Sequence, residues 1–92
     1  MKETIERKVN SFSNNSDVWK VTKTYTCWRV NFNCSSIKWQ NEYPSSLMIK
    51  DILQAEQHLI KNVIKIFKSS NKNSERFLKT TLKYINNELK NL

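Results

Sequence analysis

The stretch TYTCWRVNFNCSSIKW, residues 24–39, decides the fold. Within it Trp28, Val30 and Phe32 alternate with polar residues, and this period of two is typical of a strand with one buried face. The polar run from Asn33 to Ser36 indicates a turn, after which the alternation resumes. The stretch therefore predicts two neighbouring antiparallel strands that share an apolar face and a polar face.

Alternation of the same kind extends the sheet on both sides of the turn. Trp19 and Val21 share one face of an earlier strand. Ile37 and Trp39 share one face of the last strand. We predict a three-stranded antiparallel sheet over residues 17–41, in which the apolar parity forms the floor of the core and the other parity is polar and wet. The predicted members of the polar face are Lys20, Thr22, Cys27, Arg29, Asn31, Lys38 and Gln40.

Two cysteines in the same stretch raise the alternatives of a metal site and a disulfide. A zinc site needs three or four ligands, and Cys27, Cys34 and the distant His58 do not supply the required spacing. On one extended strand the two cysteines lie about 23 Å apart, whereas a disulfide needs Cα atoms within about 7 Å. One histidine also provides no catalytic constellation. We expect reduced thiols, no metal, no cofactor and no enzyme activity.

Helical spacing flanks the predicted sheet. Residues 1–12 repeat apolar side chains at intervals of four, four and three, which predicts a short N-terminal helix. Residues 46–68 carry a broad apolar stripe that indicates a long helix, and a polar break separates it from a last helix over 74–91. We expect an α+β fold and a single domain over residues 1–92, with the two long antiparallel helices packed on one sheet face.

Apolar residues on the last helix follow a four-three spacing, the seam of a helix that packs lengthwise on a neighbour. Because the connection to the preceding helix is short, we favour packing inside the chain. The same seam could instead join two copies of the protein as a homodimer. Its members are Leu78, Leu82, Ile85, Leu89 and Leu92.

The chain is strongly basic. Sixteen Lys and Arg against eight Asp and Glu give its 92 residues a net charge of +8, which favours polyanionic partners. The absence of glycine argues against the phosphate-cradling loops of mononucleotide enzymes. No apolar run approaches the ~18 residues of a membrane span, so we expect a cytoplasmic protein without one.

The positive charges gather in two stripes, one on each long helix. At about 100° per residue, each stripe falls within an arc of roughly 60°. A solvated face without a partner usually mixes both signs, so such segregation indicates a surface for phosphates or for an acidic protein. The sequence leaves open whether the stripes line a shared groove or lie on opposite flanks. The last helix contributes Arg76, Lys79, Lys83 and Lys90, and the preceding one Lys50, Lys61, Lys65 and Lys68.

The leading hypothesis is a small DNA- or RNA-binding protein that holds phosphates with both stripes. Stacking and base-edge contacts would come from the polar sheet face. The residues assigned there are Lys20, Arg29, Lys38 and Tyr25. The alternative is a protein of a phage or mobile element that inhibits a host or defence complex by protein-protein contact.

A third hypothesis comes from resemblance. The run from Cys27 to Phe32 is similar to a strand of the RelE-type toxin ribonucleases, which implies RNA cleavage. The similarity covers six residues, and those toxins place two helices before their sheet, so no catalytic residue is assigned. The order helix, three strands, helix also resembles the topology of the double-stranded RNA-binding domain, without its glycine-proline turn or lysine cluster.

Overall fold

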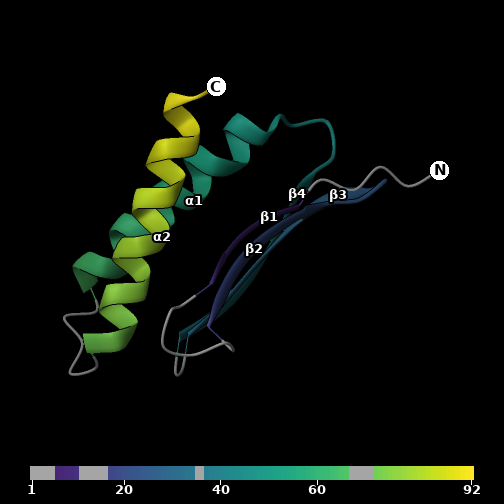
Figure 1. Ribbon diagram of the computed structural model, residues 1–92. Helices are drawn as coiled ribbons and strands as arrows, with labels where there is room; N and C mark the ends of the chain where they lie inside the picture. The colour runs from purple at the N-terminus through teal and green to yellow at the C-terminus, as the bar shows by residue number, and fades with distance from the viewer. Residues whose placement is uncertain (1–5, 11–16, 35–36, 67–71) are drawn as a thin grey trace. The chain divides into compact units, whose positions relative to one another are not determined.

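The computed structural model describes residues 6–10, 17–34, 37–66 and 72–92. The chain divides into two compact units, Met1–Met48 and Ile49–Leu92. The first unit holds the strands and the second holds the helices (Figure 1). The prediction of an α+β chain with an antiparallel sheet followed by two long helices is confirmed. The single domain and the packing of the helices on the sheet stay predictions.

The first unit is a meander of four antiparallel strands in the order β1-β2-β3-β4. Consecutive strands are neighbours because short turns join antiparallel strands without a crossover. The last strand continues three residues beyond the predicted end of the sheet. The strands are β1 (Glu6–Asn10), β2 (Val18–Lys23), β3 (Cys27–Cys34) and β4 (Ile37–Pro44).

Strand β1 stands where the sequence predicts part of the N-terminal helix. Glu6–Asn10 pairs antiparallel with β2, and Val9 lies opposite Trp19. The backbone hydrogen bonds of this pairing outweigh a weak helical pattern, since an isolated helix of about three turns is only marginally stable. The rest of the predicted helix, residues 1–5 and 11–12, lies outside the described residues.

The apolar face of the sheet is built from cross-strand rows. Trp19, Phe32 and Trp39 occupy one row across β2, β3 and β4. The rings of Phe32 and Trp39 stack with centroids 4.0 Å apart and planes 5° from parallel. Trp19 and Phe32 are buried and Trp39 is half-buried, which confirms the predicted core parity.

Trp28 anchors the other end of this face. Its indole Nε1 donates a hydrogen bond of 2.8 Å to the carbonyl oxygen of Leu47, at the end of the first unit. The Lys23 ammonium lies 5.0 Å from the centre of the Trp28 ring, within the range of a cation–π contact. A buried indole N–H needs such a partner, so the segment after β4 is tied to the sheet.

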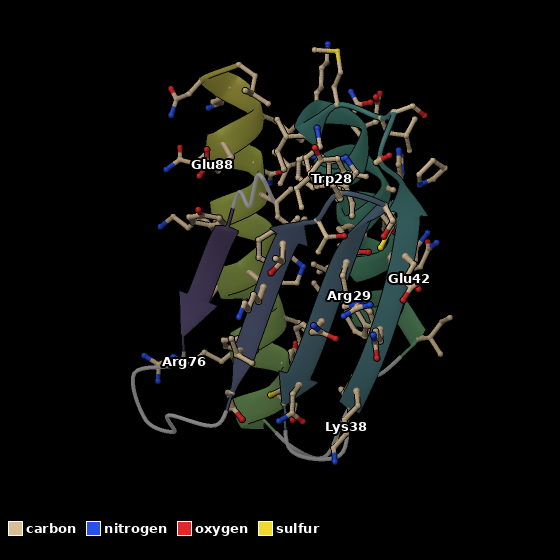
Figure 2. All side chains as sticks on the ribbon, turned by 90° about the vertical axis from the view of Figure 1, so that its right-hand side faces the viewer. Trp28, Arg29, Lys38, Glu42, Arg76 and Glu88 are labelled. Atoms are coloured by element: carbon tan, nitrogen blue, oxygen red, sulfur yellow. The ribbon has the colours of Figure 1, made fainter. Side chains whose placement is uncertain are left out.

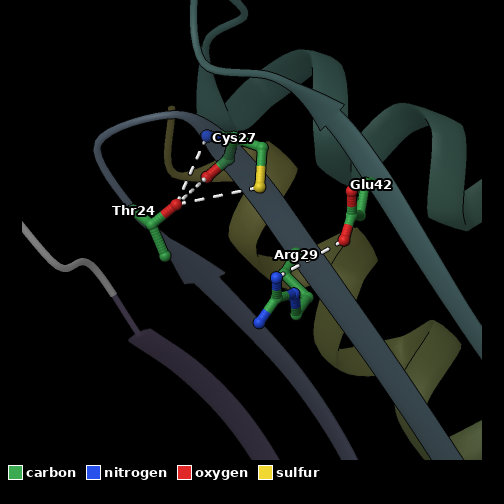
Figure 3. Close-up of polar contacts among 4 residues, drawn as sticks. All are labelled: Thr24, Cys27, Arg29 and Glu42. Carbon is green, nitrogen blue, oxygen red and sulfur yellow. Dashed lines mark hydrogen bonds and ion pairs between the residues drawn. The ribbon is translucent and has the colours of Figure 1, made fainter.

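A threonine closes the β2–β3 turn, where glycine is the usual residue. The Thr24 amide donates to the Cys27 carbonyl at 2.9 Å, and the Thr24 hydroxyl donates to the same oxygen at 3.0 Å (Figure 3). The Cys27 amide donates to that hydroxyl at 3.3 Å. Side-chain hydrogen bonds of this kind can hold a tight turn together without the backbone freedom of glycine. They leave Tyr25 exposed at the tip.

The second unit consists of α1 (Ile49–Ile66) and α2 (Lys72–Lys90), which run side by side in opposite directions (Figure 1). Helix α1 begins three residues later than predicted, because a turn with Leu47 donating to Pro44 precedes it. Helix α2 begins two residues earlier than predicted.

The buried faces of both helices are mostly apolar, with Ile60 of α1 and Leu78 and Ile85 of α2 almost fully shielded. Since Leu78 and Ile85 are already buried within one chain, at least part of the predicted seam packs inside that chain. The homodimer stays a prediction. In the described ranges, no helix combines the length and apolar character needed to cross a membrane.

Candidate nucleic-acid interface

The predicted cations of both helices are solvent-exposed. Each projects from the side of its helix away from the buried residues, because all lie in an arc that the apolar stripe does not occupy. Lys68 lies outside the described residues. The exposed members are Lys50, Lys61 and Lys65 of α1, and Arg76, Lys79, Lys83 and Lys90 of α2.

One hydrogen bond decides how the two stripes are arranged. The Gln57 side-chain nitrogen donates to the Asn86 side-chain oxygen at 2.6 Å. On its own helix, Gln57 is about 40° from Lys61, and Asn86 is about 20° from Lys79. Each amide is therefore the edge of its stripe, and the bond joins the two edges. The stripes face the same side of the helix pair and line a shared seam, the arrangement that the sequence left open.

The cations are concentrated at one end of this seam. Because the helices are antiparallel, moving along α1 from Gln57 to Lys61 corresponds to moving back along α2 from Asn86 to Leu82. At 1.5 Å per residue, the cations on this side extend about 15 Å from the bridge. Lys50 and Lys90 lie on the other side of the bridge. We call the five at the crowded end the cation cluster: Lys61, Lys65, Arg76, Lys79 and Lys83.

Two shallow depressions accompany the cluster. One, of about 430 Å³, lies along α2 and is lined by Glu75, Arg76, Lys79, Thr80 and Lys83. The other, of about 360 Å³, lies at the seam, where Lys61 and Lys65 of α1 meet Leu82 of α2. Its remaining lining residues are His58, Asn62 and Ile64. Cations at the edge of a partly apolar surface suit a nucleic-acid strand, because the cations contact phosphates and the apolar surface contacts bases.

Only one acid of the second unit belongs to the cluster. Glu75 pairs with Lys79 at 3.0 Å, in the favourable order with the acid one turn before the base. Glu88 accepts a hydrogen bond from the Tyr84 hydroxyl at 2.6 Å, away from the stripe. Glu56 is fully buried on α1. The cluster therefore keeps a positive field that one acid reduces but does not cancel.

The cations assigned to the sheet have different surroundings. Arg29 pairs with Glu42 of the neighbouring strand at 3.4 Å (Figure 3). Figure 2 looks onto the sheet and labels this pair, with Lys38 near the start of β4. Lys38 is exposed and Lys20 is partly exposed. Tyr25 is 66% exposed at the tip of the β2–β3 turn. Sequence reasoning missed Glu42, because it ended the last strand before that residue.

Cys27 and Cys34 lie at opposite ends of β3 and are not joined to each other, and their reduced state stays a prediction. Cys27 is half-buried with its sulfur 3.7 Å from the Thr24 hydroxyl, and Cys34 is buried. His58 is exposed on α1. Across the part of the chain that the structure describes, no group of three or more His, Cys, Asp and Glu is placed to hold a metal ion.

Comparison of the chain with protein-family models found no match, and comparisons with curated proteins and with solved structures found none either. Function is therefore argued from the chain's own surfaces.

Proposed function

We propose that this protein binds nucleic acid through the cation cluster of the helix pair. The Gln57–Asn86 bond carries the proposal, since it turns two separate stripes into one surface. Two packed helices have axes about 8–10 Å apart, so the lysines of both lie within reach of one phosphate backbone. This surface supplies affinity without sequence preference.

Binding is driven by the release of counterions from the phosphates. Each phosphate neutralised by a lysine or arginine contributes a slope of about −0.7 to −0.9 to a plot of log affinity against log salt concentration. With five cations in the cluster, one of them shared with Glu75, we expect three to five such contacts. Affinity should fall steeply between about 50 and 200 mM salt.

The test is a salt titration of binding to DNA and RNA fragments, with matched double variants. K61Q/K83Q removes one cation of the cluster from each helix, and we expect it to reduce the salt slope by about 1.4–1.8. K50Q/K90Q also removes one lysine from each helix and lowers the net charge by the same amount, but beyond the bridge. We expect this control to change the slope by less than half as much.

Equal effects of the two double variants would show that net charge acts alone and would contradict a defined cluster. Absence of binding at about 50 mM salt, or binding indifferent to salt, would overturn the proposal. Capture of one stoichiometric protein partner after nuclease treatment would favour the inhibitor hypothesis. Cleavage of the RNA fragments during the titration would favour the ribonuclease hypothesis.

A further inference from the structure

The polar face of the sheet carries a patch of neutral amides that the cation cluster does not explain. Asn31 lies directly opposite Gln40, and Asn33 lies directly opposite Lys38, on the neighbouring strands β3 and β4. These four residues line a shallow depression of about 310 Å³, together with Phe32 and Trp39 of the other parity. We call these four polar residues, three amides and one lysine, the amide patch.

The central pair of the patch has hydrogen-bonding capacity to offer a ligand. Among the described residues, neither the Asn31 nor the Gln40 side chain makes a hydrogen bond to another residue. Each amide has one acceptor and two donor hydrogens, and opposite Cβ atoms on paired strands lie about 4.5–5.5 Å apart. The next row differs, because Arg29 and Glu42 satisfy each other. The capacity to form hydrogen bonds with a ligand is therefore greatest at the Asn31–Gln40 row.

The chemistry of this row matches an adenine base. An Asn or Gln amide donates to adenine N7 and accepts from its N6 amino group, a pairing that guanine and cytosine do not complete. Lys38 is exposed at the rim of the same depression and supplies a cation for an adjacent phosphate. A second cation, Lys20 of β2, lies directly opposite Asn31. Directional hydrogen bonds from the amides read a base, whereas cations hold the backbone.

The width of the sheet selects the form of nucleic acid. Four strands at about 4.8 Å spacing extend about 14 Å between the outer strands, which exceeds the roughly 12 Å width of the major groove of B-DNA. A face of this width cannot enter that groove, so its amides can reach base edges only where the bases are unpaired.

We propose that the amide patch is a reading site for an unpaired adenine in single-stranded DNA or RNA. The inference rests on the proposed function, because the cation cluster provides the general affinity that brings a strand to the protein. Asn31 and Gln40 contact the base edge, and Lys38 contacts a neighbouring phosphate.

The experiment measures fluorescence anisotropy of labelled oligo(dA), oligo(dC) and a DNA duplex at about 50 mM salt. We expect the protein to bind oligo(dA) about tenfold more tightly than oligo(dC), since one bidentate amide contact discriminates by about 1–3 kcal/mol. N31A/Q40A should lose this preference while keeping its affinity for oligo(dC) and its salt slope. Q54A/N87A, which removes two exposed amides from the helices, should keep the preference.

The outcomes separate the inference from the function on which it rests. Absence of binding to every oligonucleotide would defeat the proposed function. Salt-dependent binding without an adenine preference, or a preference that survives N31A/Q40A, would overturn the reading site alone. Duplex bound as tightly as oligo(dA) would do the same. If circular dichroism shows that N31A/Q40A does not fold, the same comparison is made with Q40A, which changes only an exposed residue.

Discussion

The cation-bearing face of the helix pair and the polar face of the sheet are both hydrophilic, but they differ in how their charges are balanced. On the helices, one acid pairs with one of five clustered cations. On the sheet, Glu42 pairs with Arg29, and the next row of the polar face holds Lys20, Asn31 and Gln40. A net charge of +8 is therefore not spread evenly over the polar surface.

Because of this difference in charge, the two faces are suited to different tasks. Clustered charge acts over about 8–10 Å in physiological salt and attracts any polyanion. Amides act only at hydrogen-bonding distance and distinguish one base edge from another. We therefore expect substitutions on the helices to change affinity for all sequences, and substitutions on the sheet to change preference among them.

Reversing the charge of one lysine on each face should change nucleic-acid affinity more than any other substitution proposed below. Lys83 and Lys38 are both exposed, and within the described residues neither makes an ion pair. K83E should weaken nucleic-acid binding by about tenfold at about 50 mM salt, because it removes a phosphate contact and repels the neighbouring phosphates. K38E should weaken it by only about threefold. Anisotropy with one mixed-sequence oligonucleotide measures both, and equal losses would erase the distinction between the faces.

A smaller effect, of opposite sign, follows from releasing a cation from its acid. E75Q frees Lys79 in the cation cluster, and E42Q frees Arg29 on the sheet. We expect E75Q to tighten binding about three- to fivefold and E42Q less than twofold, although both variants gain one positive charge. Loss of the Glu75 pair removes about 0.3–0.5 kcal/mol of helix stability, so tighter binding would not come from a more stable fold. Weaker binding by E75Q would contradict a phosphate-binding cluster.

The sequence predicted the elements whose periodicity is complete. Trp28, Val30 and Phe32 mark β3 unambiguously, and the apolar stripes mark both long helices. Glu6–Asn10 was not predicted as a strand, because a five-residue segment with one apolar residue is defined by its partner β2, and no pattern within the segment shows that partner. The Arg29–Glu42 pair was missed for a related reason. The apolar alternation of β4 breaks at Asn41, between Gln40 and Glu42, although burial still alternates there.

The stripes themselves were predicted, but their convergence was not. Helical periodicity places Lys61 and Lys83 on arcs of their own helices. Which flank of each arc meets the neighbouring helix depends on side-chain packing between the two helices. The structure settles this with the contact between Gln57 and Asn86, two residues that the sequence analysis did not assign to the site.

The smallest expected effect tests that contact directly. Q57A should lower the free energy of unfolding by about 0.5–1 kcal/mol, because the hydrogen bond is largely exposed and competes with water. Q54A removes the same amide from the same face of α1, where among the described residues Gln54 has no partner, and it should change stability by less than about 0.3 kcal/mol. Urea denaturation of Q57A, N86A and the double variant gives the coupling energy.

A coupling of zero would mean that the bond adds nothing to the fixed geometry of the seam. The two stripes would then be adjacent without being held together, and K61Q/K83Q should behave as two independent losses. A coupling of about 0.5 kcal/mol or more would mean that the bridge holds the stripes in register, since residues that do not interact show additive effects. In that case Q57A should also weaken nucleic-acid binding, although it removes no charge. Q54A, which leaves the bridge intact, should not.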